Sequence, residues 1–210
     1  MRNEIAYLNP PPGKASSLAR IISTIINPVV AGIFIAGLIM FQAIGDPRLA
    51  IKWFMITVFL TVIPPLSYII YLVKIGYLVD VFMPDRQRRI KPIGFIVAWV
   101  VISTIFLAMV KAPLAIILIL MVTMVVVGLL LAITLIWKIS FHTAILTTAA
   151  TVTVLQGLSQ AWLISLLIPL VGWSRVRLRR HTTLQVIAGC ITGGIMAIVG
   201  LNLLRVYLGL

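Results

Sequence analysis

The chain contains two histidines, and both stand in short polar segments beside serine and basic residues. His142 follows Lys138 and Ser140, and His181 lies within residues 174–185, a segment that also holds four arginines. Two imidazoles and several cations around an anion-sized space could transfer a phosphoryl group: one imidazole attacks phosphorus, the other protonates the departing oxygen, and the cations hold the negative charge. The two histidines are therefore the candidate chemical groups.

A third basic segment, residues 85–92, places four cations within six positions: Arg86, Arg88, Arg89 and Lys91. Taken alone, such a segment is more typical of a contact with anionic lipid than of a phosphate site. A metal site is the rival use of the histidines. The only carboxylates near these segments are Asp80 and Asp85, and the surrounding cations would repel a divalent ion. We therefore expect neither a metal nor another cofactor.

The composition places this chemistry in a membrane. Of 210 residues, 62% are hydrophobic and 10% are charged, whereas a soluble domain is about 45–50% apolar and about 25% charged. The composition predicts an all-α fold, a polytopic bundle of transmembrane helices. The net charge of +13 then belongs in loops next to membrane lipids, because a central Lys or Arg is costly to insert. Nucleic acid is not an expected partner.

The apolar residues form seven stretches, approximately 20–44, 51–73, 93–110, 113–137, 143–156, 158–172 and 183–207. Five are long enough to cross the hydrocarbon core, whereas 143–156 and 158–172 are short for spanning. We therefore expect six to seven spans in a single transmembrane domain, residues 20–210, after a polar segment, residues 1–19. Asn27-Pro28 and Pro64-Pro65 interrupt the first two stretches, which favours kinked helices over the unwound site of a transporter.

With seven spans, the loops 74–92, 138–142 and 173–182 share one face with the N-terminus, and this face holds thirteen of the seventeen Lys and Arg residues. The positive-inside rule then predicts a multi-pass protein of the cell membrane with its polar clusters on the cytoplasmic face. Within the last stretch, Gly189 and Gly193 form a small-xxx-small pattern, which predicts close helix packing.

The order and spacing of the three clusters resemble the phosphatidic-acid phosphatase type 2 superfamily, whose motifs are K-x₆-R-P, P-S-G-H and S-R-x₅-H-x₃-D. The third motif is the most faithful: Ser174-Arg175 precedes His181 by the family spacing, and Gln185 stands where the family has Asp. Ser140-x-His142 is similar to the second motif.

The two remaining departures concern the first and second motifs. Ile139 and Phe141 replace the Pro and Gly of the second motif. In the first motif, Lys91-Pro92 resembles the R-P end and Pro84 occupies the Lys position, so that the resemblance assigns the role of this lysine to Arg86 or Arg89.

The resemblance implies a metal-independent membrane phosphatase that acts on a lipid phosphate. His181 would be the nucleophile that forms a phosphohistidine, His142 the acid and then the base, and Gln185 the group that orients His181. The implied phosphate-binding residues are Arg86, Arg89, Lys91, Ser140, Ser174 and Arg175. An isoprenyl or polyprenyl phosphate or diphosphate is favoured as the substrate, since the chain has little soluble loop for an elaborate head group; phosphatidic acid and phosphatidylglycerol phosphate are the alternatives.

Other functions stay open at this point. A catalytically inactive or repurposed homologue would follow if Gln185 cannot replace the family aspartate. A small membrane transporter with cationic anchoring loops would not need either histidine, and neither would a partner-binding subunit.

Overall fold

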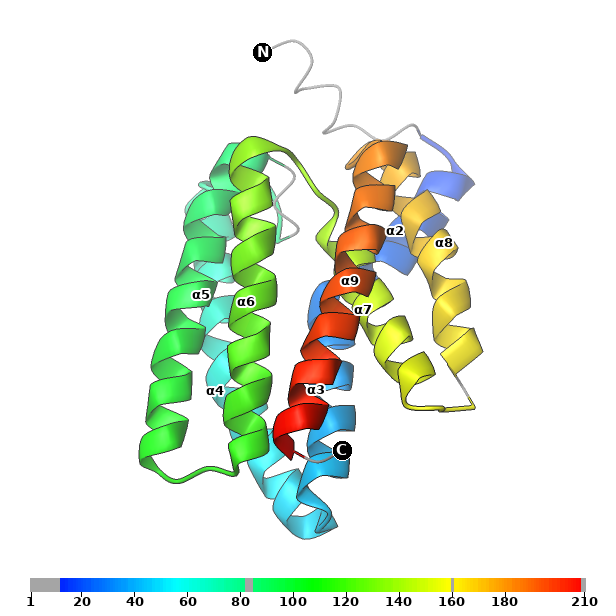
Figure 1. Ribbon diagram of the computed structural model, residues 1–210. Helices are drawn as coiled ribbons and strands as arrows, with labels where there is room; N and C mark the ends of the chain where they lie inside the picture. The colour runs from blue at the N-terminus through cyan, green and yellow to red at the C-terminus, as the bar shows by residue number, and fades with distance from the viewer. Residues whose placement is uncertain (1–11, 82–84, 160, 209–210) are drawn as a thin grey trace. The chain divides into compact units, whose positions relative to one another are not determined.

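The computed structural model describes residues 12–81, 85–159 and 161–208, which are helical and contain no strand (Figure 1). The helices are α2 (Lys14–Ile25), α3 (Pro28–Ile44), α4 (Pro47–Lys74), α5 (Arg86–Met109), α6 (Leu114–Ile136), α7 (Phe141–Leu155), α8 (Ala161–Arg177) and α9 (Thr183–Leu208). Each of the seven apolar stretches corresponds to helix, and the all-α fold is confirmed.

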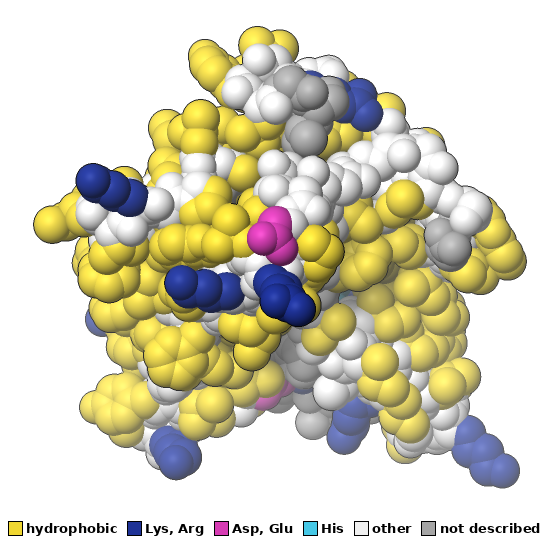
Figure 2. Space-filling view, turned by 90° about the horizontal axis from the view of Figure 1, so that it is seen from below, with side chains coloured by type: hydrophobic (Ala, Val, Ile, Leu, Met, Phe, Trp, Pro, Cys, Tyr) yellow, Lys and Arg dark blue, Asp and Glu magenta, His cyan; other side chains and the backbone are white. Residues whose placement is uncertain are grey.

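Five helical stretches among the described residues are long and apolar enough to cross a membrane: Lys14–Ile44, Pro47–Lys74, Gln87–Met109, Leu114–Ile136 and Thr183–Leu208. Large hydrophobic side chains such as Phe59, Ile136 and Val206 are strongly exposed, and hydrophobic side chains cover most of the face in Figure 2. So much apolar surface is unfavourable in water and rare on soluble proteins, whereas contact with lipid tails carries no such cost. These features identify a membrane protein. With 15 and 17 residues, α7 and α8 are shorter than each of these five stretches.

The chain forms two compact units. The first comprises Met1–Ile35 and Lys138–Leu201, and the second comprises Ala36–Trp137 and Asn202–Leu210. Both histidine segments therefore belong to the first unit, and the basic segment at 85–92 belongs to the second.

The first unit begins with α2, which starts at Lys14 rather than at residue 20. Its buried residues are Ser16, Ala19 and Ser23, a face of small side chains that packs α2 against α8. Residues 1–11 of the expected polar segment lie outside the described residues.

Asn27 and Pro28 divide the first apolar stretch into two helices. The Asn27 side-chain oxygen accepts hydrogen bonds from the backbone N–H groups of Val29, at 2.9 Å, and Val30, at 3.0 Å, so that it caps the start of α3. Pro28 occupies the first helical position, where its missing N–H removes no helical bond. The break is thus a capped junction between helices.

α7 and α9 approach closely through the two predicted glycines. A Cβ atom at Gly189 would lie 2.5 Å from Thr143 Oγ1 and 2.6 Å from the Ser140 carbonyl oxygen, and one at Gly193 would overlap the Ala144 carbonyl. The small-xxx-small pattern therefore serves packing, as predicted, and it brings the start of α9 against the start of α7.

In the second unit, α4 continues through Pro64 and Pro65. Pro64 has no N–H to donate to the carbonyl of Leu60, one turn earlier. The indole Nε1–H of Trp99 on α5 donates to this carbonyl at 2.9 Å. A side chain of the neighbouring helix thus satisfies the group that the proline leaves without its helical donor, as membrane interiors require.

Candidate active site

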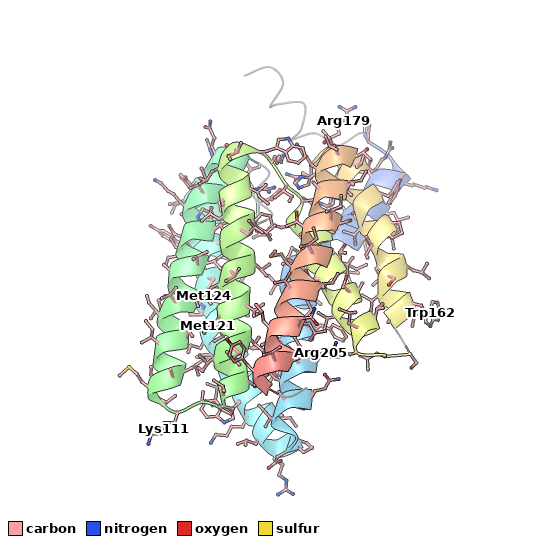
Figure 3. All side chains as sticks on the ribbon, in the orientation of Figure 1. Lys111, Met121, Met124, Trp162, Arg179 and Arg205 are labelled. Carbon is pink, nitrogen blue, oxygen red and sulfur yellow. The ribbon has the colours of Figure 1, made fainter. Side chains whose placement is uncertain are left out.

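The turn after α8 holds His181 against Arg175. The backbone N–H groups of Arg180 and His181 both donate to the Arg175 carbonyl, at 3.0 and 3.3 Å, and Arg179 N–H donates to the Val176 carbonyl at 2.9 Å. These bonds form a Schellman motif, in which Arg179 occupies the left-handed position with a φ of 52°. In Figure 3 the Arg179 side chain points away from the helices at this end of α8, whereas Trp162 lies near the other end of the same helix. The turn explains why His181 follows Arg175 at this particular spacing.

His181 and Gln185 meet at the start of α9. The Nδ1 atom of His181 lies 3.3 Å from Gln185 Oε1, and the His181 side chain is only 4% exposed. The same Oε1 accepts the backbone N–H of Thr182 at 3.2 Å, and Thr182 Oγ1 accepts the backbone N–H of Gln185 at 3.3 Å. This reciprocal pair is a capping box. Gln185 therefore has two roles, as a partner of His181 and as a cap of α9.

The second histidine lies in the first turn of α7. Ser140 caps this helix by accepting the backbone N–H of Thr143 on its side chain, and its own N–H donates to the Gln185 carbonyl at 3.3 Å. Thr143 Oγ1 donates to the Val186 carbonyl at 3.1 Å. His142 is buried, with 6% of its surface exposed. The structure thus ties the Ser140–His142 segment to the first turn of α9, directly after His181.

Arg175 is the largest side chain among the fully buried residues, at 1% exposure. Its Nη1 donates to the Ser23 hydroxyl of α2 at 2.7 Å. The hydroxyl of the neighbouring Ser174 donates to the Val171 carbonyl of its own helix at 2.7 Å. A buried guanidinium provides positive charge in a low-dielectric setting, where it acts strongly on an anion. Through this contact α2 becomes part of the site. The sequence motifs did not indicate Ser23.

The third basic segment lies in the second unit. Arg89 is buried at 4% exposure, whereas Lys91 is exposed, with its Nζ 5.4 Å from the centre of the Tyr77 ring. Arg88 donates from Nη1 to the Tyr77 carbonyl at 2.9 Å. The Arg86 side chain lies outside the described residues. The share of Arg86, Arg89 and Lys91 in phosphate binding stays a prediction.

The candidate site of the first unit therefore consists of two buried histidines, buried Arg175 and Ser140, and the half-buried Gln185, at the starts of α7 and α9 and the end of α8. Within the part of the chain that the structure describes, no group of three or more His, Cys, Asp or Glu residues could hold a metal ion. Comparison with models of known families, with characterised proteins and with solved structures gave no match.

Proposed function

We propose that the protein is an integral-membrane phosphatase that works without a metal, acts on a lipid phosphate or diphosphate, and forms a phosphohistidine at His181. One observation carries the proposal: Nδ1 of His181 lies 3.3 Å from Gln185 Oε1, in the turn whose backbone bonds to Arg175. A histidine whose Nδ1 is engaged by an acceptor presents Nε2 as the nucleophile. The resemblance of residues 174–185 to the third motif of the phosphatase superfamily supports the same role.

In the proposed first step, the lone pair of His181 Nε2 forms a bond to phosphorus. The bond between phosphorus and the lipid oxygen breaks, and this oxygen takes a proton from the imidazolium of His142. In the second step, neutral His142 takes a proton from water, the water oxygen bonds to phosphorus, and the bond between phosphorus and Nε2 breaks. Phosphate leaves, and both histidines return to their initial states.

The charge that develops on the phosphoryl oxygens needs positive partners already in place. We propose Arg175 for this role, with Ser140 as a hydrogen-bonding neighbour and the N-terminal end of α9 as a further source of positive potential. Ser174 acts less directly, because its hydroxyl proton is engaged by the Val171 carbonyl. Because these groups are fixed by helix ends, little reorganisation accompanies the reaction.

The proposed substrate has its phosphate at the membrane boundary and an isoprenyl or polyprenyl tail among the helices. The proposal includes one or both of α7 and α8 as membrane-crossing helices, which with the five longer stretches gives six to seven spans, and a cell-membrane location with the catalytic face towards the cytoplasm. Phosphatidic acid and phosphatidylglycerol phosphate are the substrates to compare.

The test measures phosphate release by the purified full chain in detergent with EDTA present. The substrates are farnesyl diphosphate, a long polyprenyl phosphate, phosphatidic acid and phosphatidylglycerol phosphate. We expect release from at least one, its loss in His181→Asn, and an acid-labile, base-stable phosphoenzyme with radiolabelled substrate. Thr148→Val is the matched control, since Thr148 joins α7 to α9 through the Gly193 carbonyl at 3.0 Å, eight positions after Gln185. Equal release by wild type and His181→Asn would refute the mechanism.

His142 is tested separately with p-nitrophenyl phosphate, whose leaving group needs no proton. His142→Asn should still form the phosphoenzyme from this compound and should hydrolyse it about 10²-fold or more slowly, because the general base is missing. Hydrolysis at the wild-type rate would exclude His142 as the base.

A catalytically inactive homologue is the second candidate function. It is favoured by the packing contacts of two site residues: Arg175 donates to Ser23, and Gln185 caps α9. This candidate predicts no phosphate release from any substrate of the panel and no phosphoenzyme, together with a loss of folding stability in Arg175→Met.

A further inference from the structure

We propose that Thr182 is a positioning residue that sets the tautomer of His181 through the side-chain amide of Gln185. The role in catalysis rests on the proposed function, whereas the tautomer itself follows from the hydrogen bonds at the start of α9. Thr182 belongs to none of the motif positions that the sequence indicated.

The need for such a residue comes from the chemistry of an amide. A carboxylate can only accept hydrogen bonds, so that it always selects the histidine tautomer with a proton on the facing nitrogen. A glutamine can present either its oxygen or its NH₂ group. With the oxygen facing Nδ1, that nitrogen carries the proton and Nε2 carries the lone pair; with the NH₂ group facing Nδ1, the assignment reverses. Gln185 alone therefore leaves the nucleophilic nitrogen undetermined.

The backbone N–H of Thr182 decides between these two orientations. It lies 3.2 Å from the Gln185 atom that faces His181 Nδ1 at 3.3 Å. An N–H group can only donate, so the atom between these two groups must be the amide oxygen. A carbonyl oxygen has two lone pairs and can accept from both neighbours. His181 then carries its proton on Nδ1, and Nε2 is the atom with the lone pair.

The Thr182 hydroxyl holds this arrangement in place. It accepts the backbone N–H of Gln185 at 3.3 Å, which fixes the first turn of α9 and the position from which the Gln185 side chain turns back. The Thr182 side chain is exposed and His181 is buried, and the Thr182 hydroxyl bonds to Gln185, so that we expect this hydroxyl to act on the nucleophile through Gln185. The capping box thus gives the amide the fixed acceptor character that a carboxylate has by nature.

The test is ¹⁵N NMR of the full chain in detergent, with ¹⁵N-histidine labelling and without a purification tag. Only two imidazoles contribute, and the His142→Gln variant assigns them. Spectra are recorded above the titration of both rings, where protonated and unprotonated ring nitrogens have well-separated shifts. We expect His181 to carry its proton on Nδ1 in the wild type. In Gln185→Met, whose thioether is only a weak acceptor for this proton, the preference should be lost.

Thr182→Val removes the hydroxyl at constant shape and should lower the ratio of the Nδ1–H to the Nε2–H tautomer about five-fold, the order expected for one lost hydrogen bond. Thr182→Ser should restore the ratio. The His142 signals are the internal reference, and Thr148→Val is the matched control for a threonine at the α7–α9 contact. If the proposed function also holds, kcat should fall in Thr182→Val in proportion to the population of the Nδ1–H tautomer, which is a smaller change than that of the ratio, with KM unchanged.

A predominant Nε2–H tautomer of His181 in the wild type would overturn the proposal, and so would a Thr182→Val ratio equal to that of the wild type. Neither result depends on phosphate release. A protein that shows the expected tautomers but releases no phosphate would refute the proposed function and would support the positioning of His181 by Thr182.

Discussion

The hydrogen bond between Trp99 and the Leu60 carbonyl predicts a specific energetic coupling between Trp99 and Pro64. Because Pro64 cannot donate to Leu60, the indole N–H at 2.9 Å replaces the missing helical bond. Trp99→Phe should therefore leave this carbonyl without a donor. In the Pro64→Ala background, the new backbone N–H can donate to Leu60, so the same substitution should cost less.

The expected coupling follows from measured hydrogen bonds in membranes. Side-chain hydrogen bonds between transmembrane helices contribute about 0.6 kcal/mol on average and at most about 1.7 kcal/mol, and an unsatisfied buried acceptor costs about 1–3 kcal/mol in general. We expect Trp99→Phe to be about 1 kcal/mol more destabilising in the wild-type background than in the Pro64→Ala background. The loss of ring area, including the stacking with Phe95 at 5.8 Å between centroids, is common to both backgrounds and cancels in the cycle.

The free energies of unfolding can be measured by far-UV circular dichroism while SDS is added to the protein in a mild detergent. The cycle needs four proteins: wild type, Trp99→Phe, Pro64→Ala and the double variant. Effects that add to within about 0.3 kcal/mol would refute the argument that Trp99 compensates for the proline. A coupling of the opposite sign would refute it as well.

Three further predictions concern the first unit, each measured as the free energy of unfolding in the same detergent titration. Gly193→Ala should destabilise by about 1–3 kcal/mol, because its Cβ would overlap the Ala144 carbonyl. Gly194→Ala is the control and should not destabilise, since a Cβ there has only ordinary contacts. Equal effects of the two substitutions would contradict the close packing of α7 and α9. Arg179→Gly should stabilise by about 1 kcal/mol, since it removes a left-handed non-glycine residue at φ 52°; a loss of stability would show that the arginine side chain matters more than its backbone. Ser23→Ala should destabilise by about 1–2 kcal/mol, because the buried arginine of α8 loses an acceptor at 2.7 Å, and Ser17→Ala on the exposed side of α2 should have no effect.

The helices could be predicted from the sequence because composition and length alone decide them in a membrane protein. The first stretch shows the limit of this approach. Its Asn27-Pro28 pair carries a readable capping signal, yet the start of α2 at Lys14 depends on packing against α8, which hydropathy does not report. The number of spans could not be predicted exactly either. Length is the sequence signal that distinguishes a span from another apolar helix, and α7 and α8 lie near the lower limit of the length that a span needs.

Contacts between distant residues were beyond sequence reasoning. Ser23 and Arg175 are 152 positions apart, and Leu60 and Trp99 are 39 apart. In each case one partner is a common residue without a motif, so its role follows only from the helix that packs against it. The Gly189–Gly193 packing could be predicted, because a small-xxx-small pattern is a local property of one helix.

The resemblance implied that Gln185 orients His181, and the structure places Nδ1 of His181 3.3 Å from Gln185 Oε1. Residues four positions apart within one helix share a face, but α9 begins at Thr183, after His181, so this rule does not explain the contact. The side chain of Gln185 instead turns back to the helix start as part of a capping box, whose T-x-x-Q signature is present in the sequence.

Two backbone turns therefore set the spacing of the third cluster. The Schellman motif fixes the number of residues from Arg175 to Arg180, directly before His181, and the capping box fixes the number between Thr182 and Gln185. The identities of residues 176–180 matter less for this geometry than their number, since their backbone N–H groups make the bonds. The position of His181 between the end of one helix and the start of the next is thus a consequence of helix termination, and any chemistry at this histidine depends on both helix ends remaining intact.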